Sequence, residues 1–328
     1  MKRTLVCLLV LIAAIVVLAL MLGDEAIPPP EVLRALLGSS DVNAAARLIV
    51  MEIRLPRVLL ALLVGMALAV AGAIVQTIMR NPLAEPGLLG INSGAALAAL
   101  VLIVQFDMPA TRYVSMVAFA GALVMTLAIY GLSWRAGANS VRIILIGIGL
   151  SALAGPLSSY ITAFGDVTAV QYAQVWLSGS VYSATWEKVW VLAAWLVLPF
   201  VLVLAASRDL DLLDLGEGPA RGLGQRVELV RALMILACAL LSGAAVAAAG
   251  LIGFIGLIAP HAARRMVGRR HTRLLPVAAL TGGVLLISAD LVGRTVIAPA
   301  QLPAGLVSAL VGAPFFAFLL WERRHVRI

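Results

Sequence analysis

The sequence is dominated by continuous apolar runs, each long enough to cross a lipid bilayer as a helix. Of its 328 residues, 62% are hydrophobic and only 12% are charged, and the mean hydropathy is +1.07. Soluble domains are about half apolar and about a quarter charged. The runs do not alternate between apolar and polar residues, as the strands of a membrane β-barrel would. The sequence therefore predicts an all-α, polytopic membrane protein.

A membrane-spanning helix needs about 20 apolar residues, and ten such spans fit the sequence. We place them at residues 4–22, 55–78, 88–106, 113–134, 143–164, 189–206, 232–249, 250–266, 274–293 and 303–321. The first run follows Met1-Lys2-Arg3, as in a signal peptide, but it exceeds the usual apolar core of about 7–15 residues. We therefore expect it to remain as the first span. We treat residues 1–328 as a single transmembrane domain.

The positive charges predict how the chain is oriented. If the amino terminus is cytoplasmic, 17 of the 24 Lys and Arg residues fall in cytoplasmic segments, as the positive-inside rule requires. Ten spans then also place the carboxyl terminus in the cytoplasm. The formal net charge of +8 would suggest a nucleic-acid partner in a soluble protein, but here the basic residues flank apolar runs. We therefore expect membrane lipid, and no nucleic acid, as a partner.

The most polar part of the chain is residues 207–231, which hold nine of its 40 charged residues (24 basic plus 16 acidic). The orientation above places this segment in the cytoplasm. A phosphate-binding loop needs a lysine after a glycine, whereas the only two lysines, Lys2 and Lys188, both follow other residues. ATP hydrolysis by that route would therefore have to come from another chain.

Two other classes of membrane protein, a metal-dependent enzyme and an ion-coupled carrier, would need ionisable residues in particular places. Asp209, Asp211 and Asp214 would suit Mg²⁺-dependent chemistry in a membrane enzyme, although acids also occur where a short helix begins. The three histidines do not have metal-ligand spacing, so we expect neither a metal site nor catalytic residues. The spans lack ionisable residues at their centres, and Asp290 lies one turn before Arg294, where the two would pair locally. This pattern disfavours an ion-coupled carrier.

The fifth predicted span carries small and weakly polar residues at helical spacing, which places them on one face. They are Gly147, Ser151, Gly155, Ser158 and Thr162. Such a face serves either close helix packing or the lining of a pathway, and both readings hold if the helix lies at an interface between subunits.

Four stretches together resemble one family, the FecCD-type permease subunits of binding-protein-dependent ABC importers. These importers carry iron-siderophore complexes, haem or vitamin B12. The stretches are Ile53–Arg57, Asn81–Gly94, Gly253–His261 and Leu302–Pro314. The resemblance covers nearly the whole chain, keeps the order of the motifs, and agrees with ten spans and two cytoplasmic ends.

The resemblance implies an assembly in the cell inner membrane. It comprises two permease copies or paired homologues, two ATP-binding cassette subunits that bind ATP and Mg²⁺, and a periplasmic or lipid-anchored substrate-binding protein. The permease itself carries no cofactor. The expected cargo is a metal chelate, most readily an iron-siderophore complex or haem, with vitamin B12 or an oxyanion as alternatives.

The resemblance also implies roles for individual residues. The 207–231 segment matches the coupling loop that contacts the ATPase, through Gly216, Glu217, Ala220, Arg221, Leu223 and Gly224. Gly222 departs from a good helix former in that loop. Guanidinium groups bind carboxylates with two parallel hydrogen bonds, and the arginines expected to hold the binding protein are Arg54, Arg57 and Arg294. The resemblance favours the pathway reading of the Gly147-to-Thr162 face. It places a cytoplasmic gate at Asn81, Pro82, Leu83, Asn139 and Ser140.

Overall fold

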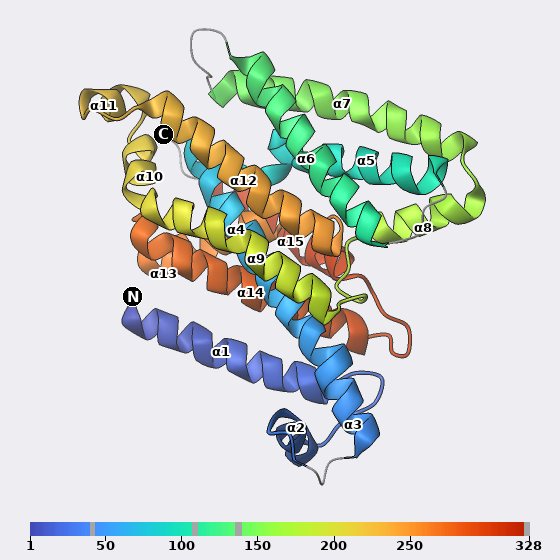
Figure 1. Ribbon diagram of the computed structural model, residues 1–328. Coiled ribbons are helices and arrows are strands. Elements are labelled where there is room, and N and C mark those ends of the chain that lie inside the picture. Colours follow the sequence, from blue (N-terminus) through green and yellow to red (C-terminus); the bar gives the residue numbers. More distant parts are fainter. Residues whose placement is uncertain (40–42, 107–110, 135–139, 325–328) are drawn as a thin grey trace.

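The computed structural model describes residues 1–39, 43–106, 111–134 and 140–324, and its described elements are helices (Figure 1). Eight of these helices are long and apolar enough to cross a membrane. They are α1 (Lys2–Met21), α4 (Leu55–Ile78), α6 (Thr111–Ser133), α7 (Ser140–Phe164), α9 (Trp186–Ala205), α12 (Val227–Ala249), α14 (His271–Thr295) and α15 (Ala304–Arg324). The shorter apolar helix α5 (Ile91–Gln105) and the 13-residue helix α13 (Ile255–Val267), whose last turn is basic, complete the set.

The remaining helices lie between these ten. They are α2 (Pro29–Leu36), α3 (Ala44–Leu48), the π-helix η1 (Ile49–Arg54), the 3-10 helix η2 (Pro86–Leu89), α8 (Val167–Leu177), α10 (Ser207–Asp214) and α11 (Glu217–Gly222). Each of the ten predicted spans therefore overlaps a helix, which confirms the all-α polytopic class.

The predicted start of the eighth span is wrong. Residues 250–254 are not helical, and α13 begins only at Ile255. Gly250 has φ +73° and ψ −163°, a backbone conformation that ends α12, and Phe254 is left-handed at φ +66°. With 13 residues, α13 is about 20 Å long at 1.5 Å per residue. It is thus shorter than the roughly 30 Å hydrocarbon layer.

Helix α4 lies at the centre of the bundle. Of an 18-residue apolar stretch within Ala44–Ile78, 78% is buried. It approaches its neighbours through glycines. A Cβ atom on Gly65 would collide with the carbonyl oxygen of Gly282 on α14, and one on Gly72 would collide with that of Gly256 on α13. Close backbone approach through small residues is how helices pack in a membrane, where no hydrophobic force brings them together. These contacts fix α4, α13 and α14 against one another.

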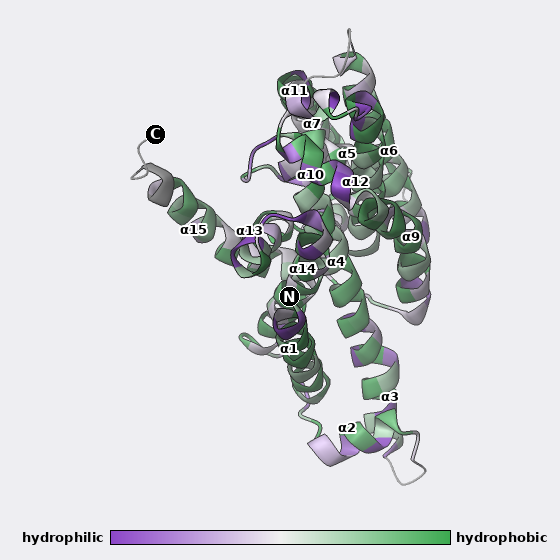
Figure 2. Cartoon of the chain, turned by 90° about the vertical axis from the view of Figure 1, so that its left-hand side faces the viewer, coloured by the Kyte–Doolittle hydropathy of each residue, from purple (hydrophilic) through white to green (hydrophobic). Residues whose placement is uncertain are grey.

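Other helices lie at the edge of the bundle. Only 17% of an 18-residue apolar stretch of α7 is buried, and only 22% of the corresponding stretch of α1. Figure 2 shows apolar helix bodies throughout and α15 projecting from the bundle. Helices that leave so many apolar side chains exposed face lipid or another subunit in a membrane.

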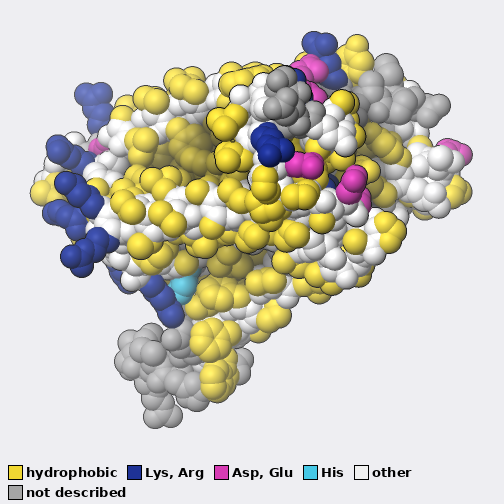
Figure 3. All heavy atoms as spheres, turned by 90° about the horizontal axis from the view of Figure 1, so that it is seen from below, with side chains coloured by type: hydrophobic (Ala, Val, Ile, Leu, Met, Phe, Trp, Pro, Cys, Tyr) yellow, Lys and Arg dark blue, Asp and Glu magenta, His cyan; other side chains and the backbone are white. Residues whose placement is uncertain are grey.

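Positive charge gathers at one end of the molecule, at the left of Figure 3, which in Figure 1 is the end with the amino terminus and α13. The exposed basic residues of these elements are Lys2, Arg3, Arg265, Arg269, Arg270 and Arg273. The start of α1 packs there against α13 and α14 through Leu8, Ala263 and Leu274. The segment with α10 and α11 lies on the same left-hand side. By the positive-inside rule this end is the one expected in the cytoplasm.

Candidate functional site

The predicted coupling segment folds into two short helices, α10, which packs against α4 and α14, and α11, which projects from the bundle (Figure 1). Gly222 is the last residue of α11 and does not prevent the helix from forming. Pro219 lies in the first turn, where its missing N–H group is tolerated. Ala220 is fully buried in a small apolar cluster with Leu213 and Val227. The segment therefore has a core of its own.

Four charged residues brace α11 against the start of α12. The Arg231 guanidinium is 3% exposed and donates to Glu217 at 2.5 Å, while it lies 3.4 Å from Glu228. Arg221 donates to Glu228 at 2.8 Å and lies 3.6 Å from Glu217. Because Arg231 is buried, its contact with Glu217 matters more than the exposed pairs of Arg221 do. Of the predicted coupling residues, Glu217 therefore helps to hold the segment together.

Two leucines of the segment point outward. The side chains of Leu215 and Leu223 are 61% and 65% exposed, on a part of the chain whose own small core is complete without them. A braced element with exposed apolar side chains suits contact with another protein.

Two of the three aspartates of the same segment, Asp209 and Asp211, are engaged in internal contacts. The carboxylate of Asp211 contacts the His271 ring at 2.7 Å, and Gln225 donates to the carboxylate of Asp209 at 3.2 Å. The described residues contain no group of three His, Cys, Asp or Glu side chains able to hold a metal ion. The contacts of Asp209 and Asp211 help to fix the fold of the segment.

At the other end of the bundle, the structure buries all three arginines predicted to dock the binding protein. Arg54, Arg57 and Arg294 are 5%, 5% and 3% exposed. Arg54 donates to the carbonyl oxygens of Leu20 and Met21 at 2.8 and 2.9 Å. Arg294 donates to that of Ala19 at 2.5 Å. Positive charge at the carboxyl end of α1 favours its unpaired carbonyl groups.

Arg57 on α4 pairs with Asp290 on α14 at 2.8 Å, whereas Arg294 lies 4.0 Å from Asp290. The local Asp290–Arg294 pair expected from their spacing is thus the longer of the two contacts. The docking role of the three arginines stays a prediction. Their internal partners mean that a carboxylate of another protein would have to displace existing contacts.

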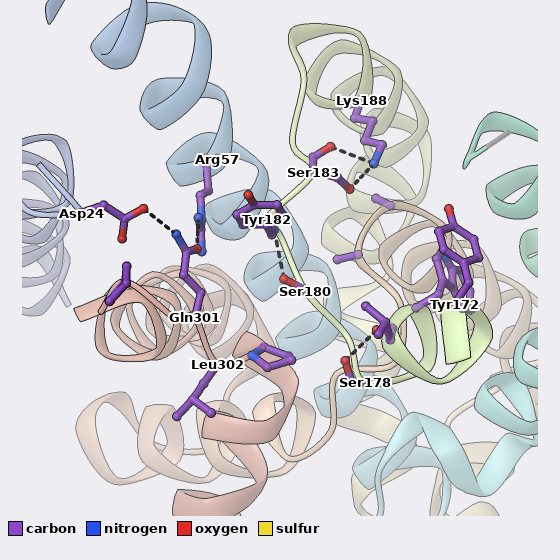
Figure 4. Close-up of a pocket in the computed structure, with 16 residues that line it drawn as sticks. Asp24, Arg57, Tyr172, Ser178, Ser180, Tyr182, Ser183, Lys188, Gln301 and Leu302 are labelled. Atoms are coloured by element: carbon purple, nitrogen blue, oxygen red, sulfur yellow. Dashed lines mark hydrogen bonds between the residues drawn. The ribbon is translucent and has the colours of Figure 1, made fainter. Parts of the chain in front are cut away.

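A cavity of about 510 Å³ lies beside Arg57, and Figure 4 shows its walls. Its polar and aromatic lining includes Asp24, Arg57, Tyr172, Trp176, Ser178, Ser180, Tyr182, Ser183, Lys188 and Gln301. The Arg57 guanidinium lies 5.4 Å from the centre of the Tyr182 ring, a cation–π distance. Lys188 donates to the Ser183 hydroxyl and carbonyl oxygens at 2.9 Å. Sequence reasoning missed this cavity, because its walls come from segments far apart in the chain.

Gln301 connects Arg57 to the first loop. It accepts from the Nη1 atom of Arg57 at 2.8 Å and donates to Asp24 at 3.1 Å (Figure 4). Arg57 is the one predicted docking arginine among the residues that line the cavity. Nε and Nη2 of Arg57 contact Asp290, whereas the partner of Nη1 is Gln301, which also lines the cavity.

The small-residue face of α7 divides between two environments. Gly147 is buried, and a Cβ atom there would collide with the carbonyl oxygen of Leu88 on η2. A Cβ atom on Gly155 would meet nothing within 4 Å. Ser158 and Thr162 donate to carbonyl oxygens one turn earlier, at 2.9 and 3.1 Å. Ser151 is partly exposed. The face therefore packs closely at Gly147 and is open around Gly155, and its role as a pathway lining stays a prediction.

The predicted gate residues are only partly described. Asn81, Pro82 and Leu83 follow α4, and the Asn81 side chain accepts the Leu83 N–H at 3.0 Å, which fixes a tight turn. Asn139 lies outside the described residues, and Ser140 is the first residue of α7. Glu85, just beyond the turn, is largely buried, and this burial raises the pKa of its carboxyl group against an opposing hydrogen bond from the Phe254 backbone.

The sequence is similar to known proteins over almost its whole length. Residues 9–322 match the FecCD transport family. The Achromobactin transport system permease protein CbrC of Dickeya dadantii is 44% identical over 322 residues, covering 97% of this chain and 90% of the relative. The Iron(3+)-hydroxamate import system permease protein FhuG of Bacillus subtilis is 41% identical over 319 residues, covering 95% and 94%.

A solved structure supports the same assignment. A chain described as a metal-chelate type ABC transporter in an inward-facing conformation is 30% identical and superimposes with a TM-score of 0.86. The match covers 98% of this chain and 100% of that one. The helical bundle, with its segment of α10 and α11, is thus that of a multi-pass transport permease. ATP is hydrolysed by a separate subunit of such a transporter. The chain belongs to the FecCD transport family of ABC importer permeases.

Proposed function

We propose that this permease moves an iron-siderophore complex inward across the cell inner membrane, driven by ATP hydrolysis in a partner ATPase. The observation that carries the cargo assignment is the similarity to two permeases named for achromobactin and for iron-hydroxamate import, over 97% and 95% of the chain. Haem, vitamin B12 and an oxyanion are the alternative cargoes. ATP and Mg²⁺ belong to the partner in this proposal, and the chain itself needs no cofactor.

We propose further that two copies of the chain form the permease, with α7 beside the pathway between them. Support comes from the exposed apolar side chains along α7, of which Leu153 and Leu157 are 63% and 53% exposed. The open part of the small-residue face, around Gly155, suits a pathway for a bulky cargo, because no side chain there fills the space. Gly147, Ser151, Ser158 and Thr162 continue that lining. A paired homologue in place of the second copy is the alternative.

The segment of α10 and α11 is proposed to contact the ATPase. Its contact surface comprises Leu223 together with Gly216, Glu217, Arg221 and Gly224, while Ala220 supports it from the small core beneath. The brace between Glu217 and Arg231 supports this role, since a rigid element transmits a push better than a loose loop.

The opposite end is proposed to receive the substrate-binding protein. Arg57 is the arginine that an incoming carboxylate can reach, by replacing Gln301 as the partner of its Nη1 atom. Arg54 and Arg294 serve indirectly, by fixing the end of α1 next to it. Closure at the cytoplasmic end is proposed to involve Asn81, Pro82 and Leu83 with Asn139 and Ser140.

The proposed function is tested by reconstitution. The permease is placed in liposomes with its ATPase and its binding protein, and uptake of ⁵⁵Fe-labelled achromobactin, ferric hydroxamate, haem and labelled cobalamin is measured with and without ATP. The proposal requires ATP-dependent uptake of a ferric siderophore. Uptake of haem or cobalamin alone would leave the permease class intact and overturn the cargo assignment. Uptake driven by an ion gradient without ATP would overturn the mechanism.

A further inference from the structure

Three side chains from three different elements form a continuous hydrogen-bonded chain that joins the coupling segment to two of the spans. They are Asp211 on α10, His271 at the start of α14 and Thr77 near the end of α4. The Asp211 carboxylate is 2.7 Å from Nδ1 of His271, and Nε2 of His271 is 2.7 Å from the Thr77 hydroxyl. We call these residues the α10 joint.

The α10 joint is buried at the end that lies inside the bundle and partly exposed at Asp211. His271 and Thr77 are 2% and 3% exposed, whereas the Asp211 side chain is 32% exposed. Asp214 on α10 and Arg264 on α13 are the further charged groups that act on the His271 ring. A buried polar group without a partner is costly, so these contacts also fix where the three elements lie relative to one another.

The contacts hold whatever the charge on the imidazole ring. The Thr77 hydroxyl has one proton and contacts both the Ala73 carbonyl oxygen, at 3.0 Å, and Nε2 of His271. With a neutral ring, Thr77 donates to Nε2 and Nδ1–H donates to Asp211. With a protonated ring, Nε2–H donates to Thr77, and Thr77 donates to Ala73. Both arrangements connect α10 with α4.

Asp211 makes a second contact that ties it to α14. Its carboxylate accepts the backbone N–H of His271 at 2.8 Å, and α14 has no capping side chain of its own at Arg270. A carboxylate at a helix amino terminus pairs with an unsatisfied N–H group and with the positive end of the helix dipole. Helix α10 thus supplies the cap of a 25-residue span.

The two spans that the α10 joint reaches are packed directly against each other, because Gly65 on α4 and Gly282 on α14 bring their backbones into contact. Leu210 of α10 is also buried in the main core, but an apolar contact is not directional. The hydrogen bonds of Asp211 specify direction and distance. A displacement of α10 is therefore passed to the cytoplasm-proximal ends of α4 and α14 through these bonds.

We propose that Asp211, His271 and Thr77 are positioning residues for transport, which convert movement of the coupling segment into movement of α4 and α14. This inference rests on the proposed contact between the segment and the ATPase. It assigns to the α10 joint the transmission step, while the ATPase contact itself belongs to the surface of α11.

The test separates transmission from assembly in the complete reconstituted transporter. The variants are Asp211→Leu, which has a similar size but cannot accept a hydrogen bond, and Thr77→Val, which replaces the hydroxyl group by a methyl group. Thr272→Val is the matched control, since Thr272 lies next to His271 and is exposed. For each variant, ATP-dependent uptake, ATP hydrolysis and the amount of ATPase bound to the permease are measured side by side.

We expect Asp211→Leu and Thr77→Val to lower uptake per ATP hydrolysed by about five-fold or more, the lower end of typical coupling between sites. Bound ATPase and the hydrolysis rate should stay within about two-fold of wild type, a change below 1 kcal/mol. Thr272→Val should leave all three unchanged. A ratio of uptake to hydrolysis equal to that of wild type in Thr77→Val would overturn the inference.

Three further outcomes can be distinguished. If uptake, hydrolysis and bound ATPase all fall in proportion, the α10 joint has a merely structural role and the inference is wrong. If Asp211→Leu does not assemble, Thr77→Val decides alone. Absence of ATP-dependent uptake in the wild-type transporter would instead contradict the proposed function.

Discussion

Arg57 on α4 holds Asp290 on α14 through two nitrogen atoms, although 233 residues separate them in the sequence. Its Nε atom lies 3.0 Å from both carboxylate oxygens, and Nη2 lies 2.8 Å from Oδ1. Both side chains are at most 6% exposed. The pair joins the two central spans at the end opposite to the α10 joint. These two polar contacts, with the glycine contact between them, hold α4 and α14 along their length.

The first prediction concerns this pair. Asp290→Ala leaves Arg57 without its carboxylate partner and should destabilise the permease by about 3–5 kcal/mol, as the removal of one member of a buried ion pair does. Replacing both residues, in Arg57→Leu with Asp290→Leu, should be less destabilising than Asp290→Ala alone, because the buried Arg57 guanidinium is removed together with its partner and only the longer contact of Arg294 with Asp290 is lost. Thermal unfolding in detergent, followed by size-exclusion chromatography, measures both. Equal losses in the two proteins would contradict this account.

The second prediction concerns Gln301 as a replaceable partner of Arg57. Gln301→Ala frees the Nη1 atom of Arg57 towards the cavity, so the binding protein should bind more tightly, by about two- to ten-fold, or up to about 1.4 kcal/mol. Gln174→Ala, an exposed glutamine on α8, is the control. Affinity is measured by surface plasmon resonance at two salt concentrations. Weaker binding by Gln301→Ala would show that Gln301 itself belongs to the docking surface.

The third prediction compares two glycines in helices. Gly72→Ala places a Cβ atom against the backbone of Gly256, where nothing flexible can give way, and should destabilise by about 1–3 kcal/mol or more. Gly149→Ala on α7 meets nothing within 4 Å and should be neutral or stabilising by up to about 1 kcal/mol, because alanine favours the helix. Unfolding temperatures of the two variants decide. Similar values would mean that α4 and α13 have room between them.

Particular residues show what could be predicted from the sequence. Apolar length alone predicted the ten helices, since a span must bury its backbone hydrogen bonds internally. It failed at 250–254, because hydropathy does not register that Gly250 and Phe254 leave the helical backbone region. The family resemblance predicted the coupling segment, which is a local motif. The partners of Arg57 and Asp211 depend on how distant helices meet, and no spacing along the chain reports that.

The fourth prediction concerns pH. Burial raises the pKa of the Glu85 carboxyl group, so folding favours its neutral form. Its contribution to stability is fully present below the pKa of the unfolded chain. That contribution is lost as the pH rises through the higher folded pKa, and is constant above it. Glu85→Gln should therefore flatten the pH dependence of the unfolding temperature above the ordinary glutamate pKa of about 4.3, and gain stability relative to wild type at the upper end of that dependence. An unchanged slope would mean that another group titrates in this range.

The fifth prediction separates the surface of the coupling segment from its brace. Leu223 is exposed and outside the small core, so Leu223→Asp should leave the permease stable while weakening ATPase binding about ten-fold or more, or about 1.4 kcal/mol.

Glu217→Ala combined with Arg221→Ala removes the contacts that hold α11 on α12, including the closest partner of buried Arg231. This double variant should lower both the stability of the segment and ATP-dependent uptake. Co-purification of the ATPase with the permease, together with uptake in liposomes, distinguishes the two effects. Because Arg208 is exposed on α10 and outside the brace, Arg208→Gln is the control for a simple change of charge. Full ATP-dependent uptake by the Glu217→Ala, Arg221→Ala protein would contradict the role proposed for α11, whereas loss of uptake with normal ATPase binding would move that role from binding to transmission.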